Sequence, residues 1–271
     1  MPSPRRSADP MLRQTLLGSI LGSAAMALRD RYELLTAPRE ALGTVANDQL
    51  AGHLVTRLAS PGTSFIDVGA HIGSIIAEVR RHCPGVSIVA FEAIPEKAAR
   101  LTAKFPGVAV HGCGLSDREG TAPFFIDLRR SGYSSLARSH DGVREVRVPL
   151  RTLDSFGLAG AVDVIKIDVE GAELGVLRGA ADLIARSRPV IMFESGPHEQ
   201  LGYGKAEMWA FFDKAGYAIH LPNRVAHTAP GLSLEGFIDS HDYPRRTTNY
   251  FAIPVERRDE IRERARRILG I

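Results

Sequence analysis

SFIDVGAHIG, at residues 64–73, is the stretch on which the fold assignment depends. Its first five residues form an apolar run with the length of a buried strand, and the residues after Gly73 have a helical pattern up to about His82. Gly69 has no side chain, so a ligand could approach the backbone there, and Gly73 would let the helix lie close to the strand. The stretch therefore predicts a strand, a ligand-binding turn and a helix.

Short apolar runs that alternate with helical patterns continue along the chain. The further runs lie at residues 87–92, 108–112, 162–169, 189–195 and 247–255, and the helical patterns at about 95–104, 173–186, 208–215 and 260–270. This alternation predicts an α/β fold with a doubly wound, mostly parallel sheet. Pieces with strand character at 121–128, 131–136 and 145–150 predict a small β insert between the third and fourth strands.

The turn at residues 67–73 also indicates the cofactor. It lacks the Gly-x-Gly-x-x-Gly pattern of dinucleotide-binding enzymes, and Asp67 ends the strand instead. A carboxylate repels a pyrophosphate but can pair with an ammonium, and S-adenosylmethionine carries an amino-acid group and no pyrophosphate. Glu92 ends the second strand, where a carboxylate can bind both ribose hydroxyls. The predicted S-adenosylmethionine site comprises Asp67, Gly69, Ala70, His71, Gly73, Glu92, Ser116 and Asp117, the last two beside the adenine.

The segment VDVIKIDVEGAE, at residues 162–173, places charges in a strand that should be buried on both faces. Lys166 and Asp168 share one face of this strand, and burial of a charge is costly unless the charge is paired or functional. We predict that Asp168 is the catalytic base and that Lys166 keeps it ionised. Glu170 is a candidate acceptor contact, whereas Glu173 suits a helix N-terminus. A divalent metal held by Asp168 and Glu194 is the disfavoured alternative, because two carboxylates leave an octahedral site incomplete.

Several motifs, in this order, resemble the FkbM family of methyltransferases. They are FIDVGAHIG, FEAIPEKAARL, GLSD, SGYSSL, RTLDSF, VIKIDVEGAELGVLRGA and IMFE, and the resemblance covers roughly residues 45–255. It implies a class I methyltransferase fold, S-adenosylmethionine as the methyl donor, and O-methylation of sugars, polyketides, glycans or similar metabolites. His71 departs from the Asn that the family usually has. The family supplies no settled catalytic residue.

The acceptor is expected to be a small molecule or a glycan. The loop 131–135 offers Tyr133 and Ser135 for stacking on a sugar-like ligand and for hydrogen bonds to it, although it could equally be an ordinary polar turn. A nucleic-acid acceptor is not expected, because IDVEG at 167–171 lacks the proline and aromatic residues that hold a flipped base. The rival functions are a nicotinamide-dependent oxidoreductase and a non-catalytic, cofactor-binding interaction protein.

Composition and charge fit one large α/β domain with appendages. The 271 residues are 44% hydrophobic and 24% charged, and the net charge of +3 is too small to indicate nucleic-acid binding. Two cysteines in unrelated contexts favour a reducing, cytoplasmic location. The expected units are a leader with N-terminal helices at 1–58, the methyltransferase domain at 59–255 and a charged helix at 256–271.

The N-terminal part of the chain should contain two helices. Residues 12–28 carry an apolar residue at every fourth position, which favours a helix packed on the domain or on a membrane surface, with a cleaved signal as the alternative. The second helix, at 48–58, could be capped by Asn47 or Asp48.

Overall fold

The computed structural model describes residues 28, 31–32, 35–36, 39–127, 143–196, 202–242 and 245–271. The leader expected at 2–10, nearly all of the helix expected at 12–28 and the loop with Tyr133 and Ser135 lie outside these residues. Within the described part of the chain, no helix is both long and apolar enough to cross a membrane.

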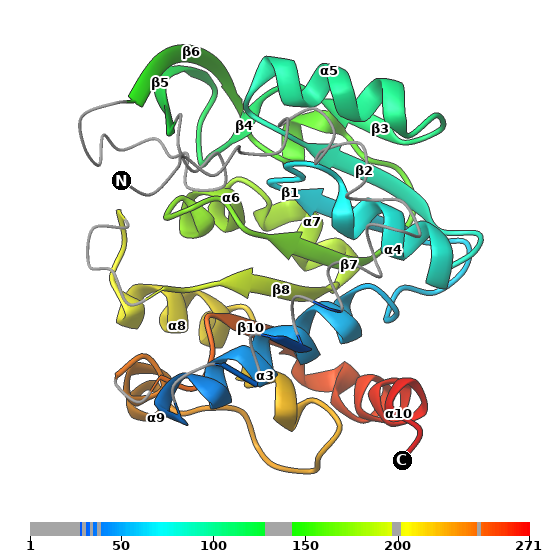
Figure 1. Ribbon diagram of the computed structural model, residues 1–271, viewed down its shortest axis with the longest axis vertical. Coiled ribbons are helices and arrows are strands. Elements are labelled where there is room, and N and C mark those ends of the chain that lie inside the picture. Colours follow the sequence, from blue (N-terminus) through cyan, green and yellow to red (C-terminus); the bar gives the residue numbers. More distant parts are fainter. Residues whose placement is uncertain are drawn as a thin grey trace, which may run out of the picture.

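The centre of the fold is a mostly parallel sheet, as predicted. Its strands within the described residues follow the order β3-β2-β1-β7-β8-β10-β9, from β3 near the top of Figure 1 to β10 below. The parallel strands are β1 (Ser64–Val68), β2 (Ser87–Phe91), β3 (Ala109–His111), β7 (Val162–Ile167) and β8 (Val190–Glu194). The remaining two are β9 (Tyr217–His220) and β10 (Asn249–Pro254), and β10 runs antiparallel to both of its neighbours.

Helices cover both faces of the sheet, because successive side chains along each strand point into two different apolar cores. Phe65 of β1 belongs to one core and Ile66 to the other. On the face of Phe65 lie α3 (Arg39–Val55), α4 (Ser74–His82), α5 (Pro95–Lys104) and α10 (Arg258–Leu269). On the face of Ile66 lie α6 (Glu173–Arg178), α7 (Ala181–Ser187), α8 (Lys205–Lys214) and α9 (Leu234–Asp239).

The predicted β insert is a separate small sheet. Its strands are β4 (Gly114–Leu115), β5 (Gly120–Asp127) and β6 (Val143–Arg151), in the order β4-β6-β5. Strands β5 and β6 pair in an antiparallel register that runs from Gly120 opposite Leu150 to Asp127 opposite Val143. The insert leaves the main sheet after β3 and returns to it at β7.

Two helices differ from the sequence-based expectation. The helix predicted at 173–186 is divided into α6 and α7, and a Cβ atom on Gly179 would lie only 2.0 Å from the main-chain oxygen of Ser116. This close contact requires glycine and coincides with the break. The helix predicted from residue 48 begins at Arg39, so Asp48 lies within α3 and does not cap it.

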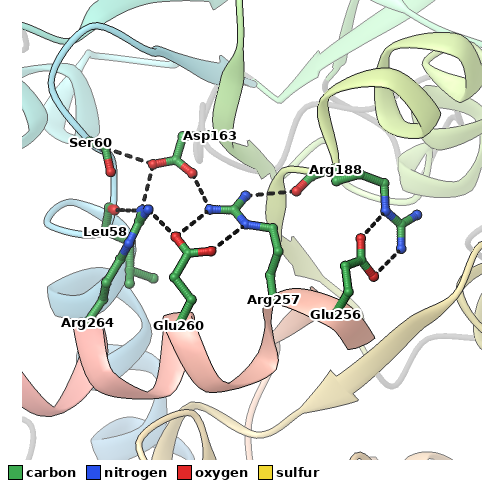
Figure 2. Close-up of polar contacts among 8 residues, drawn as sticks. All are labelled: Leu58, Ser60, Asp163, Arg188, Glu256, Arg257, Glu260 and Arg264. Atoms are coloured by element: carbon green, nitrogen blue, oxygen red, sulfur yellow. Dashed lines mark hydrogen bonds and ion pairs between the residues drawn. The ribbon is translucent and has the colours of Figure 1, made fainter.

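A polar network joins the C-terminal helix α10 to the start of β7 (Figure 2). The buried carboxylate of Asp163 accepts hydrogen bonds from the main-chain N–H of Ser60, at 2.9 Å, from Arg257, at 2.6 Å, and from Arg264, at 2.7 Å. Although burial raises the pKa of Asp163, the two guanidinium groups hold it below its ordinary value.

The four-residue spacing in α10 predicts ion pairs of Glu260 with Arg264 and of Glu263 with Arg267. The first of these pairs forms. The prediction that Glu263 pairs with Arg267 is wrong. The carboxylate of Glu263 lies 3.1 Å from Arg262 and does not contact Arg267.

Candidate active site

The turn after β1 has a left-handed backbone at both of its glycines, and each glycine also permits a close contact within the protein. Gly69 has a φ of 80°, and a Cβ atom there would lie 2.0 Å from the main-chain oxygen of Asp168. Gly73 has a φ of 81°, and its Cβ atom would meet Leu101 and Phe105 at the end of α5. The two glycines therefore permit close contact with the end of β7 and with α5, and Gly69 also lines the cavity, where a ligand could approach its backbone.

A cavity of about 440 Å³ lies at the edge where the parallel strands end. Its lining comes from the carboxyl ends of β1, β2, β7 and β8, from the residues around β4, and from α3 and the start of β10. Of the predicted site residues, those that line it are Gly69, Ala70, His71, Glu92, Lys166, Asp168, Glu170 and Glu194. This edge of a doubly wound sheet is where ligands bind, and the cavity has the size of a small-molecule site.

Glu92 follows β2 and holds the turn after β1 in place. One carboxylate oxygen accepts a hydrogen bond from the main-chain N–H of His71 at 2.8 Å, and the other accepts one from Ile94 at 2.9 Å. Burial raises the pKa of Glu92, and these hydrogen bonds and Lys97 oppose that rise. Each oxygen keeps a second lone pair, so the carboxylate can still accept a pair of hydroxyl groups from the cavity.

Asp67 lies beneath the cavity and not on its lining. Its side chain has no exposed surface, and a carboxylate oxygen lies 3.4 Å from Nζ of Lys166. Burial raises the pKa of Asp67, and the ammonium of Lys166 opposes that rise. The structure thus brings Asp67 together with Lys166, where the sequence suggested contact with the cofactor.

Ser116 and Asp117 also lie off the cavity. The chain turns away after Leu115 because the N–H of Ser116 donates to the carbonyl of Arg151, and the Ser116 carbonyl packs against Gly179. Cys113, Gly114 and Leu115 line the cavity in their place. The sequence pattern missed these three because it weighted polar groups, whereas an apolar wall is what a purine ring requires.

Lys166 and Asp168 meet at the centre of the site, as their shared face predicts. Nζ of the buried Lys166 lies 3.4 Å from a carboxylate oxygen of Asp168 and donates to the main-chain oxygen of Gly69 at 3.1 Å. Desolvation in the cleft raises the pKa of Asp168, but the charge of Lys166 and a hydrogen bond from Glu194 together bring it below its ordinary value. Asp168 is therefore ionised at neutral pH, and its side chain is 42% exposed to the cavity.

Two further carboxyl groups converge on Asp168. Oxygens of Asp168, Glu170 and Glu194 all lie within 4.8 Å of one another. Burial and the charge of Asp168 raise the pKa of Glu194 to about 10, and the same causes with Glu173 raise that of Glu170 to about 7. At neutral pH, Glu194 therefore carries a proton that it shares with Asp168, and Glu170 is half-ionised.

Glu173 has the structural role that its place at a helix start suggests. Its buried carboxylate accepts hydrogen bonds from the main-chain N–H groups of Val169 and Gly171, at 3.2 and 3.0 Å, and from the hydroxyl of Tyr203 at 2.9 Å. These bonds fix the loop between β7 and α6, which carries Glu170 in a left-handed backbone conformation with a φ of 51°.

Comparison with known families identifies the chain. The model of the FkbM methyltransferase domain matches residues 67–219, which include the turn after β1, the carboxylate cluster and the strands up to β9. The chain belongs to the FkbM methyltransferase family. This confirms the predicted family and, with it, S-adenosylmethionine as the cofactor. The cavity fits this group, because Glu92 can accept the ribose hydroxyls while Cys113 and Leu115 supply an apolar wall.

Individual relatives are distant from this FkbM protein. Methyltransferase 1 of Beauveria bassiana is 28% identical over 150 residues, covering 45% of this chain and 60% of the relative. Methyltransferase sdnD of Sordaria araneosa is 30% identical over 159 residues, covering 44% and 61%. The chain thus spans about three fifths of the length of these relatives. The crystal structure of methyltransferase FkbM from Methylobacillus flagellatus has 18% identity and a TM-score of 0.45, covering 72% of this chain and 44% of that one.

Part of the cavity wall comes from outside the segment that matches the FkbM model. Asp48 and Gly52 of α3 and Asn249 of β10 all line the cavity, and the motif-based prediction missed them. Asp48 resembles a helix cap in sequence, and Asn249 lies in an ordinary apolar strand. Their proximity depends on a contact between residues 200 positions apart, for which a single sequence carries no signal.

Proposed function

We propose that the chain is an S-adenosylmethionine-dependent O-methyltransferase that acts on a hydroxyl of a sugar, glycan, polyketide or similar metabolite. The observation that carries this proposal is the position of Asp168, whose main chain packs directly on the cofactor turn at Gly69 while its carboxylate faces the cavity. The cofactor supplies a methyl carbon that its positively charged sulfur activates toward nucleophiles. An acceptor atom that replaces this sulfur must lie beside the turn, which is where Asp168 stands.

Asp168 is proposed to accept the proton of the acceptor hydroxyl. The acceptor oxygen forms the new bond to the methyl carbon, the carbon–sulfur bond breaks, and its electron pair stays on sulfur. The proton passes to the carboxylate of Asp168, which Lys166 keeps ionised in the resting site. A carboxylate with a low pKa is a weak base, so orientation of the acceptor by the surrounding side chains must contribute much of the rate enhancement.

The donor half of the site is proposed to depend on Glu92. Loss of a hydrogen bond to a charged carboxylate weakens binding by roughly 1.5–3 kcal/mol, or about tenfold to a hundredfold. Calorimetry should therefore show Glu92→Ala binding S-adenosylhomocysteine at least tenfold more weakly than the parent protein. For Asp67, which does not touch the cavity, any effect of substitution on binding should come through Lys166.

The experiment that tests the function measures transfer of a labelled methyl group to a panel of hydroxyl-bearing compounds. Asp168→Asn should lower kcat by about 10²–10⁴ with S-adenosylhomocysteine binding nearly unchanged, because only the proton acceptor is lost. Asp213→Asn on the exposed surface of α8 is the matched control and should behave like the parent protein. Full activity of Asp168→Asn would remove Asp168 from the mechanism, and transfer to amines alone would refute O-methylation.

A metal-assisted form of the same reaction is the second candidate. Glu170 joins Asp168 and Glu194, so three carboxylates converge where the sequence suggested two. Three carboxylates with bound water could hold a divalent cation, which would orient the acceptor hydroxyl and lower its pKa. A metal would also offset the repulsion among these three carboxyl groups. That repulsion is already reduced by the proton that Asp168 and Glu194 share and by the charge of Lys166, so the metal-free base remains our preferred mechanism.

A further inference from the structure

Asp48 of α3 is the centre of a hydrogen-bond cluster at the wall of the cavity. Its Oδ1 accepts bonds from the hydroxyl of Thr247 at 2.7 Å, the N–H of Thr248 at 2.9 Å and the side-chain amide of Asn249 at 3.2 Å. Its Oδ2 accepts a bond from the hydroxyl of Thr248 at 3.0 Å. The carboxylate of Asp48 thus joins α3 to the segment that enters β10.

The cluster fixes which way the carboxamide of Asn249 faces. A carboxylate only accepts hydrogen bonds, so the atom of Asn249 that meets Asp48 must be the nitrogen, and this Nδ2 also donates to Thr248 Oγ1 at 3.1 Å. The carbonyl oxygen Oδ1 of Asn249 accepts no hydrogen bond from the described residues. Because Asn249 lines the cavity, this oxygen is the polar atom that it can offer to a ligand.

Asn249 belongs to the end of the cavity away from the cofactor turn. In a doubly wound sheet the methyl donor is expected at the side of the cavity formed by the ends of β1 and β2, near Gly69 and Glu92. Asn249 lies opposite Glu194 in the register of β10 and β8, on the far side of β7. An acceptor that reaches Asp168 from this side therefore passes Asn249 and Glu194.

Among the described residues, the polar side-chain groups that line this end are oxygens of carboxyl and amide groups. They come from Asp48, Asp168, Glu170, Glu194 and Asn249. The described ammonium group beside them, that of Lys166, is already paired with two carboxylates. Such a wall accepts hydrogen bonds from hydroxyl or ammonium groups and repels carboxylates and phosphates. Asp48 and Asn249 both lie outside the segment that matches the family model, so this part of the wall is a feature of the flanking elements.

We propose that Asp48 and Asn249 form the acceptor-selecting wall of the site: Asp48 orients Asn249 so that its carbonyl oxygen binds a hydroxyl of a neutral, polyhydroxylated acceptor, and anionic acceptors are excluded. This inference rests on the proposed O-methyltransferase function. Asp48 is a positioning residue, and Asn249 is the residue that contacts the acceptor.

The test compares two ligands that differ in one charged group. Methyl glucoside and methyl glucuronide share a ring, and the second carries a carboxylate. Saturation-transfer NMR titrations, with the protein saturated with S-adenosylhomocysteine, should give a dissociation constant for the glucoside at least tenfold below that for the glucuronide. Asn249→Leu should weaken glucoside binding by about tenfold with unchanged S-adenosylhomocysteine affinity, since one hydrogen bond is lost.

Asp48→Asn tests the orienting role. A carboxamide at position 48 can both donate and accept, so Asn249 is free to turn its nitrogen toward the cavity, and the preference for the glucoside should fall at least fivefold. Asn47→Ala is the matched control. Asn47 joins the same helix to the main chain of Arg246 at 3.0 Å without lining the cavity, so its loss should leave the preference unchanged.

Three results would overturn the inference. They are equal or tighter binding of the glucuronide by the parent protein, unchanged glucoside binding in Asn249→Leu, and binding of neither sugar while S-adenosylhomocysteine still binds. Absence of S-adenosylhomocysteine binding in the parent protein would instead refute the proposed function itself. A fall in preference in Asn47→Ala equal to that in Asp48→Asn would show that only the attachment of α3 matters.

Discussion

Nζ of Lys166 lies 3.4 Å from the fully buried carboxylate of Asp67 and donates a hydrogen bond to the main-chain oxygen of Gly69 in the turn after β1. The ammonium compensates a charge that has no contact with solvent, so removal of one partner leaves the other uncompensated. Lys166→Met should therefore lower the free energy of unfolding by about 3 kcal/mol in urea denaturation at pH 7. Burial already raises the pKa of Asp67, so without Lys166 the loss should grow as the pH rises through that raised pKa.

The double variant Asp67→Leu with Lys166→Met is the control for this pair. It removes both charges, and it should recover about 2 kcal/mol or more of the loss, because a buried ion pair can be replaced by apolar side chains at little cost. A double variant no more stable than Lys166→Met would show that Lys166 acts mainly through the carbonyl of Gly69.

Glu170 should set the pH dependence of the rate. Its pKa, raised to about 7 by burial and by Asp168, means that its second negative charge beside Asp168 appears as the pH rises through neutrality. This charge strengthens Asp168 as a proton acceptor, so kcat should increase with an inflection near pH 7. Glu170→Gln should lack that inflection and stay near the low-pH rate. The inflection would persist in the variant if another group caused it.

Removal of divalent metal should leave the reaction intact. Under the preferred mechanism, protein treated with EDTA and then dialysed should keep its kcat within about twofold, because no step of proton removal needs a cation. Loss of activity that Mg²⁺ restores would establish the metal-assisted form. In that case Glu170→Gln should weaken Mg²⁺ binding in calorimetry, as expected for a carboxylate ligand.

The fold was more predictable than the site. The apolar runs that became β1, β2, β7 and β8 are visible because a buried parallel strand is continuously apolar and a glycine turn follows β1. The prediction missed strand β9, which has only four residues, and the short helix α9. Neither element has an apolar run or a helical pattern long enough to be recognised. Parallel strand ends share one edge, which is why Asp168 and Glu194 could be placed together from the pattern.

The pattern of apolar runs could not predict that Asp48 and Asn249 line the cavity together. Asp48 and Asn249 meet because β10 is antiparallel, so that its first residue, and not its last, reaches the cavity. The spacing of apolar residues encodes which face of a strand is buried, and it does not encode the direction or the partner of an edge strand.

Asp163 should control the stability of α10 and not the binding of the donor. Asp163→Asn leaves Arg257 and Arg264 without their buried partner and should lower the free energy of unfolding by about 3 kcal/mol (Figure 2). The folded pKa lies below the ordinary value of 3.8, so this contribution is present above that value and is lost as the pH falls through the folded pKa. Glu256→Gln, which breaks an exposed pair with Arg188, should cost less than about 1 kcal/mol.

Both Asp163→Asn and Glu256→Gln should bind S-adenosylhomocysteine as the parent protein does, because Asp163 lies at the opposite end of β7 from the cavity. A matching loss of affinity in Asp163→Asn at a temperature where it stays folded would show that α10 influences the site.

His220 of β9 should be replaceable with a gain in stability. Its ring is 1% exposed, and neither nitrogen has a hydrogen-bond partner among the described residues. Burial, with help from Arg258, lowers its pKa to about 3, so the folded protein loses stability as the pH falls from 6.5 toward 3. His220→Leu should be more stable by about 1 kcal/mol at pH 7, with a larger gain at pH 5. The exposed His227→Leu is the comparison and should show no gain.

The antiparallel placement of β10 brings Asn249, from outside the family-matching segment, to the cavity, so under the proposed function acceptor choice can vary separately from methyl transfer. The segment that leads from Arg245 into β10 reaches the cavity edge from outside the parallel strands, so its composition can change while the turn after β1 and the carboxylates stay in register. Exchange of this segment together with α3 between relatives is a route to new acceptors that leaves the methyl-transferring half untouched. Under the proposed function, we expect the two halves of the cavity to be separate targets for protein engineering.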